Sequence, residues 1–247
     1  MKLQDVPRKA IDKSRRVGAR WFGRDDVSWE RVAKRSDLAR LGTAYGGWVV
    51  PLDSLSSVSV CYCVGCGEDI SFDLGLIERL GCDVFAFDPT PEAVAYVSRV
   101  ASGNDHYRFS ALGLWDKDEV LRFYVPSNPD HVSHSLLNLQ KTEAFIEVPV
   151  DRLSHIMQRN GHPRIDLLKL DVEGAEYKVI DSLVEDRLDI GVICVEYDEL
   201  HHALDGAYRA RVAASIRKLL AFGYALVSVD GKANYTFIKV GNPSSLH

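Results

Sequence analysis

The chain has 247 residues, of which 46% are hydrophobic and 26% are charged, a composition typical of a globular protein with one substantial core. Its formal net charge is −5 at pH 7. This charge argues against a protein that binds duplex nucleic acid, because such proteins present clustered basic side chains to the phosphates. We therefore expect a small molecule or a glycan as the partner, and the sequence leaves homo-oligomer formation open.

The cysteines and the apolar stretches bear on the cellular compartment. The five cysteines, an odd number, follow no secretory leader, so a disulfide framework is not expected. Cys61, Cys63 and Cys66 lack the second cysteine pair of a zinc site, so we reject zinc at these residues and assign no metal ligands. No stretch reaches the roughly 18 consecutive apolar residues of a membrane span. The sequence therefore predicts a cytoplasmic protein without a membrane span.

The first part of the chain differs from the rest in its pattern of charged and apolar residues. Charged and apolar residues alternate at helical spacing from Met1 to about Leu41, which predicts short amphipathic helices. We therefore assign residues 1–50 to a helical N-terminal extension. The core domain is expected over residues 51–242, and residues 243–247 are expected to form a flexible tail.

After residue 51, short runs rich in β-branched residues alternate with longer stretches of helical periodicity. Such alternation implies right-handed crossovers and a parallel sheet covered by helices on both faces. The predicted helices are Ile70–Leu80, Pro91–Ala101, Glu176–Leu183 and Tyr208–Phe222. The predicted strands are Val58–Val64, Val84–Phe87, Tyr107–Phe109, Ile165–Leu170, Ile190–Glu196, Tyr224–Val229 and Tyr235–Val240.

The expected fold is therefore an α/β domain with a Rossmann-like, doubly wound sheet of seven mostly parallel strands. The turn pair Asp230-Gly231 favours a hairpin between the last two strands. This hairpin makes the terminal strand antiparallel and places it at the end of the sheet. Residues 114–150 interrupt the alternation and predict an inserted β-ribbon near the ligand-binding edge.

Two motifs are expected at the carboxyl ends of neighbouring strands, where open α/β sheets bind ligands. Gly65 and Gly67 follow the first core strand and let the backbone turn tightly against a ligand. Asp88 ends the second strand, where a carboxylate accepts hydrogen bonds from ribose hydroxyls. An aspartate there also serves to cap the helix that opens at Pro91, but its pairing with the glycine loop favours a cofactor site.

The strongest local feature is a strand that runs directly into an acidic loop and a helix, Ile165–Glu176. Lys169 is charged inside an apolar run, so desolvation demands a partner for it. Asp171 and Glu173 follow the strand and are candidates for site residues. The alternative is that these acids only stabilise the positive end of the following helix dipole.

A second acidic strand end follows later in the chain. Glu196 ends the run Ile190–Val195, and His201 comes shortly after it. Asp171, Glu196 and His201 are our candidate catalytic residues, as general bases towards a hydroxyl group. The same residue types bind divalent cations, but their spacing alone does not fix a ligand geometry.

These motifs together resemble the FkbM family of methyltransferases, which use S-adenosylmethionine and mostly methylate hydroxyl oxygens. The resemblance covers roughly residues 41–240. It rests on the strings Val64–Phe72, Phe87–Pro91, Ala111–Gly113 and above all Asp166–Glu176.

The resemblance implies O-methylation of a glycan or a small metabolite. It places the glycines near the methionine portion of S-adenosylmethionine, Asp88 near the ribose and Ala111-Leu112 near the adenine, while Asp171 and Glu173 flank the transferring methyl group. The implied cofactor-binding residues are Gly65, Cys66, Gly67, Glu68, Asp69, Asp88, Pro89, Ala111, Leu112, Asp171 and Glu173.

The chain departs from the family pattern at two positions of the glycine loop. Cys63 stands where most methyltransferases have an acid, and Asp69 stands where they have a third glycine. We therefore expect Glu68 or Asp69 to hold the amino group of the cofactor. Trp48 is expected either to shape the acceptor pocket or to plug the core beneath the N-terminal extension.

Two alternative functions share parts of this pattern. An NAD-dependent oxidoreductase would use Gly65, Gly67 and Asp88 as well, but the chain lacks the third glycine and an evident catalytic Tyr-Lys pair. A catalytically inactive methyltransferase-like binding protein would keep the fold and the cofactor loop. Binding of S-adenosylmethionine and methyl transfer separate these alternatives.

Overall fold

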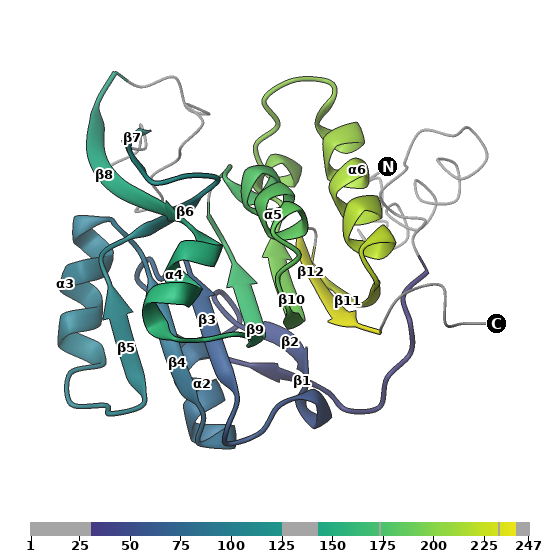
Figure 1. Ribbon diagram of the computed structural model, residues 1–247, viewed down its shortest axis with the longest axis horizontal. Coiled ribbons are helices and arrows are strands. Elements are labelled where there is room, and N and C mark those ends of the chain that lie inside the picture. The colour runs from purple at the N-terminus through teal and green to yellow at the C-terminus, as the bar shows by residue number, and fades with distance from the viewer. Residues whose placement is uncertain (1–30, 125–142, 173, 232, 241–247) are drawn as a thin grey trace, which may run out of the picture.

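The main sheet of the domain is doubly wound, as the sequence predicts. The computed structural model describes residues 31–124, 143–172, 174–231 and 233–240. Within these ranges, seven strands form one sheet in the order β11-β12-β10-β9-β3-β4-β5 (Figure 1). The strands are β3 (Val60–Val64), β4 (Asp83–Phe87), β5 (Tyr107–Ser110), β9 (Ile165–Leu170), β10 (Ile190–Glu196), β11 (Tyr224–Asp230) and β12 (Asn234–Lys239).

The order of the strands reverses between β3 and β9. The chain runs outward from β3 through β4 to β5, returns to pair β9 with β3, and then continues in the opposite direction to β10. Strands β3, β4, β5, β9 and β10 are parallel to their neighbours in this part of the sheet. Their carboxyl ends therefore meet at one edge, with the switch point between β3 and β9.

The antiparallel strand lies one position further inward than the sequence predicts. β12 pairs antiparallel with both β10 and β11, so β11 forms the edge of the sheet. The connecting turn contains Gly231 at a positive φ of 64°, which glycine adopts without steric cost. The hairpin itself is confirmed; the sequence could not reveal which of its two strands would pair with β10.

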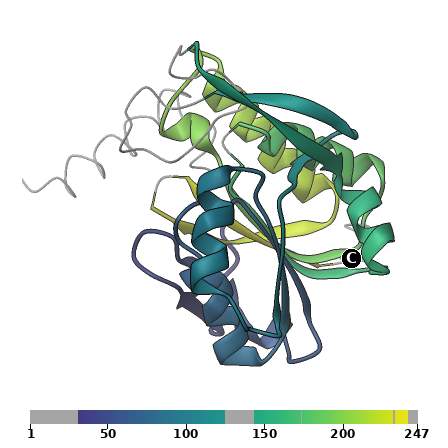
Figure 2. The ribbon, with the colours of Figure 1, turned by 90° about the vertical axis from the view of Figure 1, so that its left-hand side faces the viewer.

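Helices cover both faces of the sheet. α2 and α3 pack on one face, while α4, α5 and α6 pack on the other. Figure 2 shows the blue helices on one side of the sheet and the green helices on the other. The helices are α2 (Ser71–Leu80), α3 (Pro91–Val100), α4 (Leu153–Asn160), α5 (Glu176–Glu185) and α6 (Tyr208–Ala221), with short 3-10 turns η2 (Leu52–Ser54) and η3 (Asp198–Leu200).

The alternation of side chains along β3 explains why its sequence is apolar throughout. Tyr62 and Val64 point into the core beneath α4 to α6, whereas Cys61 and Cys63 point into the core beneath α2 and α3. All five cysteines of the chain are buried free thiols. Burial raises the pKa of the Cys194 thiol to about 12, as expected where water cannot solvate a thiolate.

A second, smaller sheet corresponds to the predicted ribbon. In the part of residues 113–152 that the structure describes, three strands pair in the order β6-β8-β7. β7 and β8 are antiparallel, and β6 runs parallel to β8. The strands are β6 (Gly113–Trp115), β7 (Glu119–Tyr124) and β8 (Phe145–Arg152).

The N-terminal region contains a β-hairpin where the sequence predicted helices. β1 (Leu38–Leu41) pairs antiparallel with β2 (Trp48–Pro51). Residues 1–30, like the predicted tail 243–247, lie outside the described residues. The glycine-rich turn between β1 and β2 breaks a helix, and the hydroxyl of Thr236 donates a hydrogen bond of 2.7 Å to the carbonyl of Val49.

Trp48 is 2% exposed and packs in the core beneath α2 and α3. Of the two expectations for Trp48, the structure therefore favours a core residue, and Trp48 does not line the cavity described below.

Among the helices that the structure describes, none is both long enough and apolar enough to span a bilayer.

Candidate functional site

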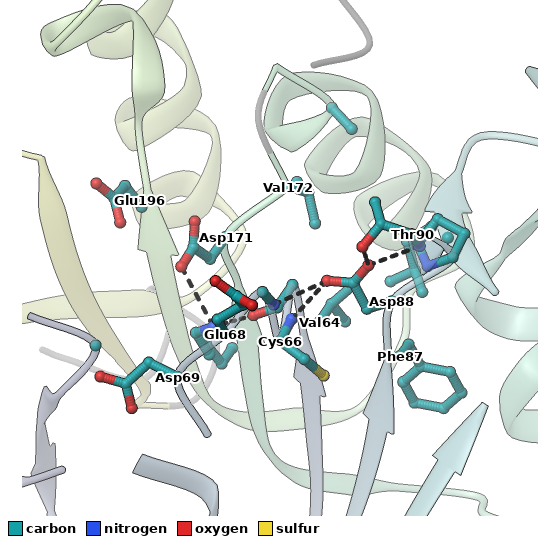
Figure 3. Close-up of a pocket in the computed structure, with 18 of the residues that line it drawn as sticks. Val64, Cys66, Glu68, Asp69, Phe87, Asp88, Thr90, Asp171, Val172 and Glu196 are labelled. Atoms are coloured by element: carbon teal, nitrogen blue, oxygen red, sulfur yellow. Dashed lines mark hydrogen bonds and ion pairs between the residues drawn. The ribbon is translucent and has the colours of Figure 1, made fainter. Parts of the chain in front are cut away.

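A cavity of about 440 Å³ opens at the carboxyl ends of the parallel strands (Figure 3). Its volume lies within the range of about 300–1,000 Å³ that is usual for small-molecule sites. The residues around it come from widely separated parts of the chain: Tyr45, Gly46, Val64, Gly65, Cys66, Gly67, Glu68, Asp69, Phe87, Asp88, Pro89, Thr90, Gly113, Leu114, Phe123, Lys169, Asp171, Val172, Ala175 and Glu196.

The glycine loop after β3 forms the floor of this cavity. Gly65 has a φ of 82° and Gly67 a φ of 48°, values that side chains other than glycine rarely adopt. A Cβ atom at Gly65 would lie 1.7 Å from the carbonyl oxygen of Asp171. No larger residue fits at Gly65, because the ends of β3 and β9 approach each other there.

The carboxylate of Asp88 clamps the glycine loop. Its Oδ2 accepts hydrogen bonds from the backbone N–H groups of Cys66 at 2.9 Å and Gly67 at 3.0 Å. Its Oδ1 accepts from the backbone N–H of Thr90 at 2.9 Å and from the Thr90 hydroxyl at 2.6 Å. Figure 3 shows Asp88 between the loop and Thr90.

This arrangement changes the expected role of Asp88. Thr90 caps α3 by accepting a hydrogen bond from the N–H of Ala93, so Asp88 supports the helix through Thr90 instead of capping it directly. A carboxylate offers about four acceptor sites, and the loop and Thr90 occupy four. A ribose hydroxyl would therefore have to replace one of these bonds, most simply the bond from the Thr90 hydroxyl.

Lys169 lies beneath the loop and is only 4% exposed. Its ammonium group donates to the carbonyl oxygen of Gly65 and forms an ion pair of 3.3 Å with Asp171. Burial lowers the pKa of Lys169, but the negative charges of Asp171 and Asp73 outweigh this effect, so the pKa is raised above its usual value. The predicted need of Lys169 for a partner is confirmed.

Sequence analysis missed the role of Asp73 on α2. Its side chain is buried at 3% exposure, beside Lys169 and Cys63. The phenol of Tyr107 donates a hydrogen bond of 3.1 Å to it. Burial raises the pKa of Asp73. Asp73 thus supplies a carboxylate next to Cys63, where the family pattern has an acid in the strand itself.

Two of the three candidate catalytic residues line the cavity, and the third contacts one of them. Asp171 and Glu196 stand at its edge (Figure 3). The Nε2 atom of His201 lies 3.2 Å from Oε1 of Glu196. His201 follows η3 and is 41% exposed at its side chain. The structure therefore places a carboxylate–imidazole pair and a second carboxylate beside the same space.

Among the residues that the structure describes, no group of three or more His, Cys, Asp or Glu side chains has a metal-binding arrangement.

The remaining predicted cofactor residues differ in their placement. Cys66, Glu68, Asp69 and Pro89 line the cavity, and Glu68 is exposed. Glu173 lies outside the described residues.

Glu68 and Asp69, the two residues expected to hold the amino group of a cofactor, differ in their hydrogen bonds. Asp69 accepts hydrogen bonds from the Thr43 hydroxyl at 2.5 Å and from the Ser71 N–H at 2.8 Å. Both carboxylate oxygens of Asp69 are thus already engaged in local structure. Glu68, the neighbouring residue of the glycine loop, is exposed and also lines the cavity.

The cavity wall near β5 is built by residues that follow Ala111 and Leu112, the two residues predicted to lie near the adenine. Ala111 and Leu112 form the turn after β5, and Leu112 packs against the apolar core instead of facing the cavity. Gly113 and Leu114 of β6 and Phe123 of β7 line the cavity. Gly113 belongs to the string Ala111–Gly113 that carries the family resemblance. Sequence analysis missed Leu114 and Phe123, because the packing of the small sheet beside the main sheet is a tertiary feature.

The chain is similar in sequence to two mammalian proteins. A rat protein described as "Probable methyltransferase-like protein 24" (Rattus norvegicus) is 25% identical over 232 residues, which cover 90% of this chain and 56% of that protein. Its human counterpart (Homo sapiens) is 27% identical over 169 residues, which cover 67% of this chain and 38% of that protein. The chain thus spans about half, or less, of the length of these relatives.

A solved structure of the fibrillarin pre-rRNA processing protein of Methanococcus jannaschii is 12% identical, with a TM-score of 0.44 and coverage of 87% of each chain. The model of the methyltransferase FkbM domain family matches residues 66–226, which include Cys66 to Asp69 of the glycine loop, Asp88 and the string from Asp166 to Glu176. This chain belongs to the FkbM methyltransferase domain family.

Proposed function

We propose that this protein is an S-adenosylmethionine-dependent methyltransferase that acts on a hydroxyl group of a glycan or a small metabolite. The observation that carries the proposal is the glycine loop tied to Asp88 on the floor of a cavity that Asp171 and Glu196 also line. Its location at the switch point of the sheet supports a nucleoside-containing cofactor. Membership of the FkbM family supports the same cofactor.

The residues present fit such a cofactor. Gly67 lines the cavity, and no protein atom lies within 4 Å of the position where its Cβ would be, so ligand atoms have room to approach the backbone there. Asp88, Gly113 and Leu114 would hold the adenosine end, because they line the cavity on the β4–β6 side. The exposed carboxylate of Glu68 would receive the amino group. When bound, the cofactor supplies an electrophilic methyl group on a sulfonium centre.

The acidic residues at the edge of the cavity, Asp171 and Glu196, would bind the methyl acceptor and take up its proton. A hydroxyl oxygen that takes up a methyl group must lose its proton, and the Glu196–His201 pair or Asp171 would accept it. Carboxylate oxygens also accept hydrogen bonds from neighbouring hydroxyls, which favours a polyhydroxylated acceptor such as a sugar. The five buried free thiols agree with a reducing compartment, and we propose a cytoplasmic location.

The binding proposal is tested by thermal unfolding with different ligands. A ligand present at about 100 times its Kd stabilises the native state by about 2.7 kcal/mol. For a chain of this size that corresponds to a rise in Tm of about 5–10 °C. We expect S-adenosylmethionine and S-adenosylhomocysteine to produce such a rise and NAD to produce none.

Two outcomes of these experiments would favour a different function. Stabilisation by NAD alone would overturn the proposal in favour of an oxidoreductase. Binding of S-adenosylmethionine without release of S-adenosylhomocysteine, across a panel of hydroxylated glycans and metabolites, would favour an inactive binding protein.

A further inference from the structure

The loop between β1 and β2 forms one wall of the cavity. Tyr45 and Gly46 line it together with residues of the glycine loop. Tyr45 is 86% exposed, so it lies outside the core, at the surface where the cavity that it lines opens. This wall precedes residues 66–226, which the family model matches, and no predicted site residue comes from it.

The loop is fixed to the glycine-loop side of the cavity by hydrogen bonds. The hydroxyl of Thr43 donates to Asp69, and the backbone N–H of Thr43 donates to the Ser71 hydroxyl at 2.8 Å. The same Thr43 hydroxyl oxygen accepts from the N–H of Gly46 at 3.0 Å and from the N–H of Tyr45 at 3.3 Å. The backbone of Tyr45 is therefore held in place.

Close packing adds to this anchoring. A Cβ atom at Gly46 would lie 2.7 Å from the carboxyl carbon of Asp69, and one at Gly47 would lie 2.3 Å from the carbonyl oxygen of Thr43. The bonds from Ser71 and Thr43 outweigh the effect of partial burial and lower the pKa of Asp69, so Asp69 stays ionised as the acceptor. The loop is thus a built part of the site.

The place of Tyr45 along the cavity indicates which part of a cofactor it would meet. Asp88 and Gly113 lie towards β4 and β6, where the adenosine end is proposed to bind. The remaining atoms of the cofactor would then extend along the glycine loop towards Asp69, against which Gly46 packs. The sulfonium and the methionine portion would lie on this side, next to Tyr45.

We propose that Tyr45 is a specificity-determining residue that recognises the positive charge of the sulfonium through its aromatic ring. This inference rests on the proposed function. The face of an aromatic ring attracts a cation, and the attraction disappears when the cation becomes neutral. S-adenosylmethionine carries a sulfonium, whereas its demethylated product is a neutral thioether. Tyr45 therefore favours the methyl donor over the product and promotes product release.

The test compares the affinities of the full chain for both nucleosides by isothermal titration calorimetry. We expect Tyr45→Leu to weaken binding of S-adenosylmethionine about 3- to 10-fold and to change binding of S-adenosylhomocysteine less than about 2-fold. Tyr45→Phe retains the ring and should keep the wild-type ratio. Tyr96→Leu, on α3 and away from the cavity wall, is the matched control.

The outcomes separate this inference from the proposed function. An unchanged affinity ratio in Tyr45→Leu, or an equal loss in Tyr45→Phe, would overturn the role of the ring while leaving the cofactor assignment intact. Binding of neither nucleoside to the wild-type chain would overturn both. Unfolding curves of the three variants establish that each is folded.

Discussion

At the residue scale, Lys169 connects the two strand ends that form the site. Its buried ammonium group contacts the carbonyl of Gly65 and the carboxylate of Asp171, with Asp73 nearby. A buried charge without its partner is strongly unfavourable. The stability of the site therefore depends on one cation that faces two carboxylates and a backbone carbonyl.

We predict that Lys169→Met lowers the free energy of unfolding by about 3–5 kcal/mol, because it leaves the two carboxylates without a buried counter-charge. Urea denaturation measures this change. Lys178→Met is the control, since Lys178 is 56% exposed at its side chain and pairs with Asp116 at 3.4 Å; exposed pairs contribute about 0–1 kcal/mol. Equal effects of the two substitutions would contradict this account of Lys169.

Asp171 presents a different case, because it lies at the cavity edge with a side chain that is 30% exposed. Asn keeps its shape while removing its charge and basicity. We predict that Asp171→Asn stays folded, because Asp73 remains as a carboxylate near Lys169, and that it reduces methyl transfer about 100-fold or more, the usual contribution of a general base. The measurement is the rate of S-adenosylhomocysteine formation with a responsive acceptor.

The exposed Asp181→Asn serves as the control for that experiment, because Asp181 contacts Lys218 on the surface of the helices. A wild-type rate in Asp171→Asn would remove Asp171 from the mechanism and leave Glu196 with His201 as the proton acceptor.

At the element scale, Arg152 joins the ribbon to the main domain. It stands at the end of β8 and donates hydrogen bonds to Asp186 at 2.6 Å and Glu185 at 3.0 Å, beyond and at the end of α5. It also donates to the carbonyl of Asp116 at 2.6 Å. The hydrogen bond from Arg152 is the largest cause of a lowered pKa at Asp186.

This contact predicts a dependence of stability on pH. A carboxyl group whose pKa is depressed by folding stabilises the native state above its unfolded pKa of about 3.9, and this contribution is lost as the pH falls through the folded pKa. We predict that Arg152→Leu lowers the free energy of unfolding by about 1–2 kcal/mol at pH 7. The deficit should shrink below about pH 4.

Chemical denaturation at pH 7, 5 and 3 checks this prediction. Arg122→Leu, on β7 of the same small sheet, is the control because its pair with Glu147 is 60% exposed on both sides. A deficit of Arg152→Leu that is the same at every pH would show that packing of the side chain, and not the charge of Asp186, is responsible.

At the scale of the whole molecule, the site is a meeting point of four separate regions. The β1–β2 loop, the glycine loop, the β4 end and the β9–β10 edge come together because the strand order reverses beside β3. The small sheet adds a wall from β6 and β7. No region contains a complete site by itself, so cofactor and acceptor binding depend on the assembled domain.

Much of this arrangement could be predicted from local sequence. Buried parallel strands require continuous apolar runs, and the glycines, Asp88 and the acids after β9 stand at strand ends where their types have a direct physical meaning. The strand–helix alternation therefore predicted the sheet and its seven strands within the described residues. It also indicated that Lys169 needed a partner, although not which one.

The sequence by itself determined the fold class, the glycine loop and the acidic strand ends, because these follow from periodicity and from the chemistry of neighbouring residues. Only the tertiary structure decided that Asp88 clamps the loop, that Asp73 accepts a hydrogen bond from Tyr107 near Lys169, and that Tyr45 lines the cavity. The hydrogen bonds of Asp88 to the loop and of Asp73 to Tyr107 join residues more than twenty positions apart, and they form only when packing of the sheet brings these residues together.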